Sequence, residues 1–250
     1  MNTTVVSDTF YIGWDVGGWN CDKNSKSRDA IVILDSNLAL KGKPWRGSLR
    51  ASINDAAENT RDWLGRLFRL CQTELPAGPV RTILAIDTPL GFSEAFTRLI
   101  TRLEVDGQIG QSSTNPYLFR QTERFLFEHG HKPLSAVKDM IGSQATKGMH
   151  VLAKFAPRVL QCGVWTDGEV LTVIEAYPSA CKRSATIGDL RRRYASLSHD
   201  DQEDALTCAL IAYLFAENSD LLSPPGDNVP PSEGWIWVPK DGLQNNIKTG

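Results

Sequence analysis

The nonapeptide FYIGWDVGG, residues 10–18, decides how the rest of the chain is interpreted. Its apolar and aromatic residues are typical of a β-strand, and the two glycines at its end release the backbone from the strand. Successive side chains of a strand point to opposite faces, so Tyr11, Gly13 and Asp15 share one face. The segment therefore places a carboxylate inside a core strand, where an acid is either held for structural reasons or used in function.

Composition narrows the class of protein. The 250-residue chain has a formal net charge of -2 and five cysteines. So small a charge provides no overall basic field, and any contact with a polyanion must be local. The cysteines are odd in number and never spaced as CxxC, which predicts reduced thiols rather than a disulfide framework or a zinc site. Without a signal peptide or an apolar run of roughly 18 residues, the sequence predicts a cytoplasmic protein that does not enter a membrane.

Hydrophobic patterning predicts an α/β domain. Strands are expected over residues 10–16, 30–34, 38–41, 80–87, 159–164, 170–177 and 235–239, and helices over residues 48–75, 94–104, 117–128, 134–155 and 201–217. The first three strands form an antiparallel meander. We interpret the chain as one domain spanning residues 1–250, in which residues 93–157 form a helical insertion.

Acids recur at the ends of these core elements. Asp87 ends the strand at 80–87, and Glu175 lies near the end of the strand at 170–177. Asp201 and Asp204 lie in the first turn of the helix at 201–217, where residues three apart are neighbours on one face. Acids there also stabilise the helix dipole, so both explanations stay open for Asp201. Asp204 follows the buried face of the helix, which favours a functional role.

Acids that the fold brings together need a counter-charge. Two carboxylates about 5 Å apart repel by on the order of 3 kcal/mol at an effective dielectric constant near 20. Such a cluster must bind protons or a hard cation. Oxygen ligands without histidine or cysteine indicate Mg²⁺ or Mn²⁺ rather than zinc. Two such ions can activate a water molecule and stabilise the leaving oxygen of a phosphodiester.

Five short motifs follow one another in a specific order. They read GWDVGG, AIDTPLGFS, VIEAYPSA, HDDQEDALTCALIAYLFA and EGWIWVP. Together they resemble the domain-of-unknown-function family numbered 429, whose members are described as predicted nucleases of ribonuclease H-like fold. The resemblance spans residues 11 to 239. It implies a mixed five-stranded sheet flanked by helices, formed by a meander, a helix, a strand ending in Asp and a late helix that bears an acid.

The resemblance also implies a site. By it, Asp15, Asp87, Glu175 and Asp204 are catalytic metal ligands, and Asp201 is a further carboxylate ligand beside Asp204. The spacing of the last two acids is similar to that of the paired acids in Holliday-junction resolvases. The implied reaction is hydrolysis of a phosphodiester in a nucleic acid or nucleotide with two Mg²⁺ or Mn²⁺ ions. DNA, RNA and a small nucleotide stay open as substrates, as does the oligomeric state.

Basic residues outside these motifs could bind a substrate phosphate. Lys147, Lys182 and Arg183 are the candidates, although a solvated charged face is the commoner explanation for such residues. Arg120 and Glu123 lie three apart in a predicted helix, a spacing typical of weak surface ion pairs.

Two other functions stay open. Sugar-kinase and actin-like ATPases share the fold and begin with an Asp-x-Gly turn. Here the turn Asp15-Val16-Gly17-Gly18 lacks the hydroxyl residue that usually follows, and no second glycine-rich phosphate loop is present. The other alternative is a non-catalytic module that uses residues 93–157 to hold a nucleotide or a protein.

Overall fold

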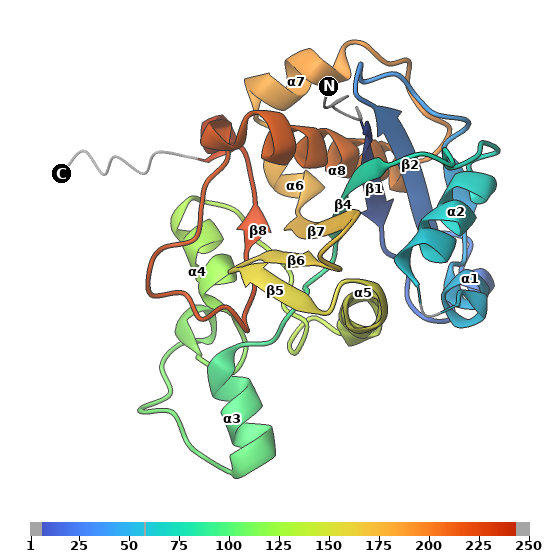
Figure 1. Ribbon diagram of the computed structural model, residues 1–250. Helices are drawn as coiled ribbons and strands as arrows, with labels where there is room; N and C mark the ends of the chain where they lie inside the picture. Colours follow the sequence, from blue (N-terminus) through green and yellow to red (C-terminus); the bar gives the residue numbers. More distant parts are fainter. Residues whose placement is uncertain (1–6, 58, 244–250) are drawn as a thin grey trace, which may run out of the picture.

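The computed structural model describes residues 7–57 and 59–243, which form a mixed sheet with helices on both faces (Figure 1). The domain limits predicted at residues 1 and 250 lie outside this part of the chain. None of the helices in the described ranges is long and apolar enough to cross a membrane.

One sheet of eight strands runs through the described residues. Its strands are β1 (Asp8–Asp15), β2 (Asp29–Asp35), β3 (Trp45–Gly47), β4 (Val80–Asp87), β5 (Arg158–Gln161), β6 (Val164–Thr166), β7 (Leu171–Ala176) and β8 (Ile236–Trp237). The order is β3-β2-β1-β4-β7-β6-β5, and β8 pairs with the end of β7. Strands β1, β4 and β7 are mutually parallel, whereas β2 is antiparallel to both β1 and β3.

The mixed α/β architecture is confirmed, but the predicted five-stranded sheet is too small. The antiparallel strands β5 and β6 extend one edge, and β8 adds a parallel strand beside β7. The third strand of the meander is β3, whereas residues 38–41 contribute only an isolated bridge between Leu34 and Leu40.

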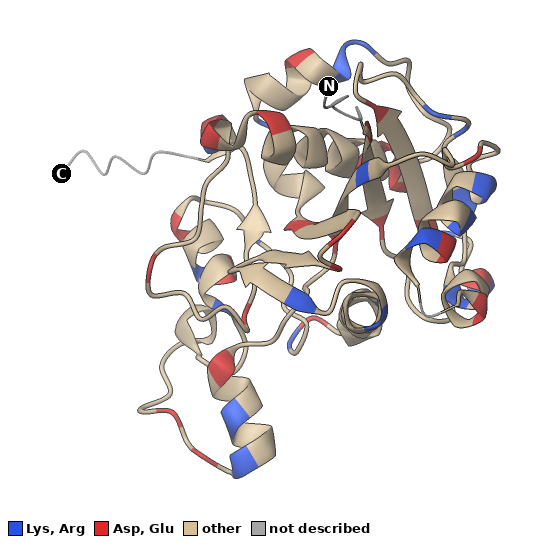
Figure 2. Ribbon diagram, in the orientation of Figure 1, with Lys and Arg blue, Asp and Glu red and all other residues tan. Residues whose placement is uncertain are grey.

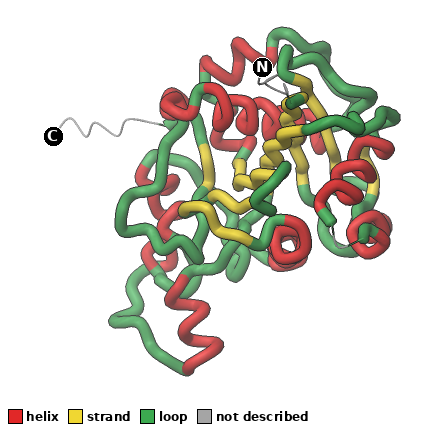
Figure 3. The backbone as a smooth tube through the Cα atoms, in the orientation of Figure 1, coloured by secondary structure: helices red, strands yellow, loops and turns green. Residues whose placement is uncertain are grey.

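Eight α-helices connect or cover these strands in the described ranges. They are α1 (Arg50–Asp55), α2 (Thr60–Leu70), α3 (Glu94–Arg102), α4 (Gln121–Glu128), α5 (Gly142–Phe155), α6 (Pro178–Cys181), α7 (Ala185–Arg191) and α8 (Asp200–Glu217). The long helix predicted over 48–75 divides into α1 and α2, because the Asn59 side chain accepts a hydrogen bond from the Asp62 N–H and begins a new helix. The helix predicted over 134–155 begins only at Gly142, and Figure 3 shows how much of the chain between α3 and α5 is loop.

The alternation predicted for the first strand is confirmed by the core. Phe10, Ile12 and Trp14 pack on one face of the sheet with side chains of α1, α2 and α5. Tyr11 packs on the opposite face, in the cluster that contains the apolar residues of α8. Gly13 shares that face, and a Cβ atom there would lie 1.8 Å from the Ala205 carbonyl oxygen. The missing side chain thus lets the backbone of α8 lie directly on β1.

The segment predicted as a helical insertion, residues 93–157, contains α3, α4 and α5. Helix α5 belongs to the core, since Val151 and Phe155 pack in the same cluster as β1. Helix α3 projects away from the sheet (Figure 1), and its Ile100 side chain is 60% exposed. The segment therefore combines one core helix with a projecting arm.

Candidate active site at the carboxyl edge of the sheet

Two carboxylates end neighbouring parallel strands at the same level. Asp15 of β1 and Asp87 of β4 are register partners, so their side chains lie on the same face, which α8 covers. The carboxyl edge of parallel strands is where open α/β sheets bind ligands. Both side chains are half-buried, and neither forms a hydrogen bond or ion pair within the described residues.

The surroundings of this pair disfavour a double negative charge. Burial, followed by the charges of Asp204 and Glu175, raises the pKa of Asp87 to about 8. Burial and the charge of Asp87 raise the pKa of Asp15 well above its usual range, and Asp201 and Asp204 add to this effect. The pair therefore holds a proton near neutral pH or requires a cation.

Helix α8 brings two further acids toward this pair. Asp204 is half-buried and, within the described residues, forms no hydrogen bond or ion pair. Burial raises the pKa of Asp204, although the charge of Lys182 opposes the rise. Asp201 is already engaged, because its Oδ2 accepts hydrogen bonds from the Arg28 N–H at 2.9 Å and Arg46 Nε at 2.7 Å. Asp204 is thus an α8 acid whose oxygens are not engaged by any other described residue, unlike those of Asp201.

Glu175 does not join the other acids on their face of the sheet. It pairs in register with Ile86, one residue before Asp87, so it points to the opposite face. There, Arg120 donates to Glu175 through Nη1 at 2.8 Å and Nη2 at 2.6 Å, and the Leu90 N–H donates at 3.0 Å. The prediction that Glu175 is a free metal ligand conflicts with this placement.

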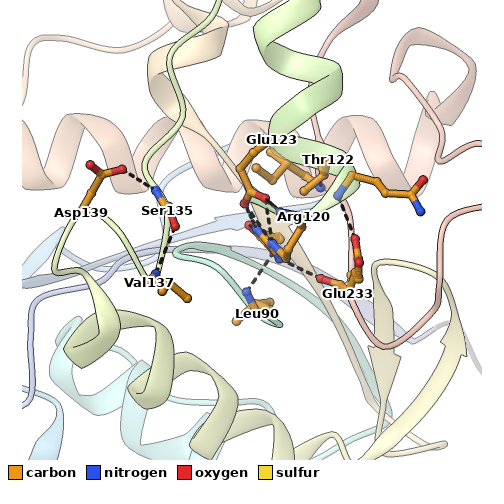
Figure 4. Close-up of polar contacts among 12 residues, drawn as sticks. Leu90, Arg120, Thr122, Glu123, Ser135, Val137, Asp139 and Glu233 are labelled. Atoms are coloured by element: carbon orange, nitrogen blue, oxygen red, sulfur yellow. Dashed lines mark hydrogen bonds and ion pairs between the residues drawn. The ribbon is translucent and has the colours of Figure 1, made fainter. Parts of the chain in front are cut away.

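Arg120 occupies the centre of a buried ionic network (Figure 4). Its side chain also donates to Glu123 and to the Glu233 carbonyl oxygen. Arg120 is 3% exposed, so the prediction of a weak surface pair with Glu123 is wrong. Burial alone would lower the pKa of Arg120, but the charges of Glu123 and Glu175 raise it instead. The guanidinium stays charged and links α4, β7 and the segment before β8.

A second buried ion pair supports the loop that follows β1. The Lys147 ammonium group donates to the Asp29 carboxylate and to the Gly17 carbonyl oxygen, and neither charged side chain is exposed. Asp29 also accepts from the Gly17 N–H and the Leu49 N–H. Asp29 is the first residue of β2, one position before the strand predicted over 30–34, and it is fully buried.

The three predicted phosphate-binding cations have different positions. Lys147 is fully enclosed, which conflicts with its predicted contact to substrate. Lys182 and Arg183 are exposed, and Lys182 lines a cavity of about 200 Å³ together with Asp204. Other Lys and Arg residues are distributed over several elements, including α2 and α3 (Figure 2).

A cavity of about 230 Å³ opens beside Asp15 and Asp87, and we call it the edge cavity. Glu123 and Glu175 also line it, so the Arg120 network forms part of its wall. Apolar residues complete the wall, among them Ile141 at the start of α5 and Ile236 of β8. The cavity thus joins residues from both halves of the chain.

The carboxylates present fit a hard cation in their chemistry. Within the described residues, Asp15, Asp87 and Asp204 have carboxylate oxygens without a hydrogen bond or ion pair, which is the donor type that Mg²⁺ and Mn²⁺ prefer. In the described part of the chain, no group of three or more His, Cys, Asp or Glu side chains is close enough to hold a metal ion as it stands. Comparisons with protein-family models, curated proteins and solved structures found no match for this chain.

Proposed function

We propose that this protein is a metal-dependent phosphodiesterase that acts as a nuclease. The observation that supports it most is the register pairing of Asp15 with Asp87 at the carboxyl edge of the sheet. Neither carboxylate has a hydrogen bond or ion pair within the described residues, and the pKa of each is raised. Two such carboxylates destabilise the fold unless they bind a cation or exchange a proton in a reaction.

The ligand set we propose is smaller than the one implied by sequence. Asp15, Asp87 and Asp204 hold the cation, because their oxygens are not committed elsewhere. Asp201 would be a further ligand beside Asp204, although its Oδ2 is bound by Arg28 and Arg46 and its Oδ1 lies 3.4 Å from His199 Nδ1. Glu175 acts behind the site by fixing Arg120 and the backbone at Leu90.

The ribonuclease H-like fold is part of the same proposal. The meander β1-β2-β3, the helices α1 and α2, the strand β4 ending in Asp87, and the late helix α8 bearing Asp204 follow the order of that fold. The central strand order β3-β2-β1-β4-β7, with β2 antiparallel, supports this assignment. Strands β5, β6 and β8 are then additions at one edge.

When bound, divalent ions would supply the charge that stabilises the phosphorane-like transition state and an acidified water molecule. The protein's part is to hold the carboxylates before the substrate arrives. Asp15 and Asp87 are fixed by the strands that bear them, and Asp204 by the helix that packs on Gly13. The Gly17 N–H donates to Asp29, so this amide is not free to bind a nucleotide phosphate as an ATPase loop would.

The test is cleavage of labelled DNA, RNA and small phosphodiesters with Mg²⁺ or Mn²⁺. Asp15→Asn and Asp87→Asn keep the side-chain shape, and each is expected to lower the cleavage rate by at least about 100-fold, or roughly 2.7 kcal/mol. Asp227→Asn is the matched control, because Asp227 is exposed in a loop.

Binding of the ion is measured separately from activity. Mn²⁺ should raise the melting temperature of the wild type and of Asp227→Asn but not of Asp15→Asn. Cleavage that persists in both Asp15→Asn and Asp87→Asn would remove the proposal. Stabilisation by ATP without any phosphodiester cleavage would favour the ATPase alternative instead.

A further inference from the structure

Acidic and apolar residues line the edge cavity together. Its acids are Asp15 and Asp87, without ion-pair partners among the described residues, and Glu123 and Glu175, which pair with Arg120. Val16, Ile141 and Ile236 belong to the apolar remainder, with Pro133 and Ala176 beside them. A ligand that matches this lining has two parts. An anionic group lies near the acids, where a bound cation bridges the two, and a neutral apolar group fills the cavity.

Cations are missing from the wall. Of the described residues that line the edge cavity, none is Lys or Arg. The Arg120 guanidinium lies behind Glu123 and Glu175, and it already donates hydrogen bonds to both carboxylates. An anionic ligand group inside the cavity would meet carboxylates and no cationic side chain of the described residues, so the part of the ligand that lies away from the bound cation must be neutral.

A polar group without a partner among the described residues is available to orient such a ligand. Thr88 lines the cavity, its side chain is 5% exposed, and its hydroxyl has no hydrogen-bond partner among the described residues. Gln144 also lines the cavity, and its amide forms no hydrogen bond within the described ranges. An amide offers both donors and acceptors, as does the edge of a nucleobase. Gln144 is only partly buried, so its amide is open to a ligand from the cavity, whereas the unpaired Thr88 hydroxyl is enclosed behind the wall.

The aromatic residue Tyr177 lines the edge cavity, and a hydrogen bond holds its side chain in place. The Tyr177 hydroxyl donates to the Lys132 carbonyl oxygen at 3.1 Å, which ties the end of β7 to the loop before α5. Burial and the charge of Asp87 raise the pKa of Tyr177, so the ring stays neutral and close to the acids. Aromatic side chains bind unpaired bases by stacking on the face of the ring.

The size of the cavity limits what can enter. Its volume of about 230 Å³ is below the roughly 300–1,000 Å³ of pockets that hold drug-sized ligands, so it suits one small ring system. A paired base in a duplex cannot reach such a cavity unless it leaves the stack. The size of the cavity therefore disfavours an intact double helix as the substrate.

We propose that the edge cavity binds one unpaired nucleobase, and that the substrate is a single-stranded nucleic acid or a mononucleotide unit at its end. This inference rests on the proposed nuclease function. The base lies between Tyr177 and the apolar wall, Gln144 contacts its polar edge, and its phosphate lies at Asp15 and Asp87.

The experiment measures binding of uncharged nucleosides by calorimetry, in EDTA and in Mg²⁺. Nucleosides lack phosphate, so binding should be equal in both buffers and should be unchanged within about twofold in Asp227→Asn, which changes an exposed residue outside the cavity wall. Ile141→Trp fills the cavity and Gln144→Ala removes the amide, and each should weaken binding at least about tenfold. Ile109→Trp and Gln108→Ala are matched controls on exposed positions of the loop after α3.

A second measurement compares single-stranded with duplex oligonucleotides of one sequence. Wild-type protein should cleave the single strand at least about tenfold faster, and Ile141→Trp should remove that preference. Equal cleavage of both forms, with Asp15→Asn inactive, would overturn the base-binding inference and leave the nuclease function standing. Nucleoside binding that Ile141→Trp abolishes, in a protein without metal-dependent cleavage, would keep the base pocket and remove the nuclease. Failure of every nucleoside to bind at about 10 mM would refute the inference outright.

Discussion

The ammonium group of Lys147 lies against the carboxylate of Asp29, and neither side chain is exposed to solvent. The pair joins α5 to β2 beneath the glycine turn that follows Asp15. Because Lys147 also donates to the Gly17 carbonyl oxygen, it fixes the backbone next to the proposed site. The ion pair is therefore expected to affect stability first and activity through the position of Asp15.

Lys147→Met should lower the free energy of unfolding by about 3–5 kcal/mol, because it leaves the Asp29 charge buried without its partner. Urea unfolding of the wild type and the variant measures the difference. Lys138→Met is the control, since the Lys138 ammonium group is solvent-exposed where it contacts Asp139 and the Phe119 ring, and its loss should cost less than about 1 kcal/mol. A loss below 1 kcal/mol for Lys147→Met would show that the buried pair contributes little.

Arg120 should be intolerant of replacement by lysine as well as by an apolar residue. Arg120→Met leaves Glu123 and Glu175 buried without a counter-charge, so we expect a loss of at least about 3 kcal/mol. A lysine restores one charge but not the several N–H donors that Arg120 directs to both carboxylates. Arg120→Lys should therefore recover only part of the melting temperature. Full recovery of the melting temperature would indicate that a positive charge alone, without the geometry of the guanidinium group, stabilises the buried network around Arg120.

The stability of the metal-free protein should fall as pH rises. An ordinary Asp has a pKa of about 3.9 when unfolded, and the pKa of Asp87 in the folded protein is about 8. The folded state therefore binds more protons between these values. The stabilisation from Asp87 is complete below about pH 4 and is lost as pH rises through 8.

Asp87→Asn removes this titration. In EDTA, the variant should unfold at a higher temperature than the wild type at pH 9, by about 2–4 °C for each kcal/mol of repulsion relieved, with little difference at pH 4. Differential scanning calorimetry across this range measures it. Parallel pH profiles for the two proteins would contradict the raised pKa of Asp87.

Gly13 should be irreplaceable because of the contact between β1 and α8. The Cβ atom of an alanine at this position would meet the Ala205 carbonyl oxygen and the Ala209 nitrogen at 1.8 and 2.4 Å. We expect Gly13→Ala to cost more than about 3 kcal/mol or to prevent folding. Gly188→Ala is the matched control, because Gly188 lies in α7 with nothing within 4 Å of the new Cβ atom. That change should stabilise the protein by about 0.5–1 kcal/mol.

Local patterns predicted elements and faces but not register. The strand at residues 80–87 and the opposite faces of Tyr11 and Trp14 follow from periodicity, and the structure agrees. Glu175 could not be placed this way, because a shift of one residue between strands reverses the face of every side chain. Periodicity within β7 gives no information on its alignment with β4.

The burial of polar residues was the other feature that the sequence alone did not predict. The spacing of Arg120 and Glu123 shows that they are neighbours on a helix, but their partner Glu175 is 55 residues away from Arg120 in sequence. Asp29 looks like a loop residue beside other polar residues, and only the folded chain brings Trp14, Leu49 and Lys147 to it. Long-range pairing of this kind leaves no local pattern in a single sequence.

The edge cavity is complete only after the late strand β8 has been synthesised. Ile236 belongs to its wall, whereas Asp15 precedes it in the chain by 236 − 15 = 221 residues. At synthesis rates of about 5–20 residues per second, roughly 10 to 45 s separate the two on the ribosome. During that interval Asp15 is present without a finished cavity, so a newly made chain is unable to hold a ligand there until β8 pairs with β7.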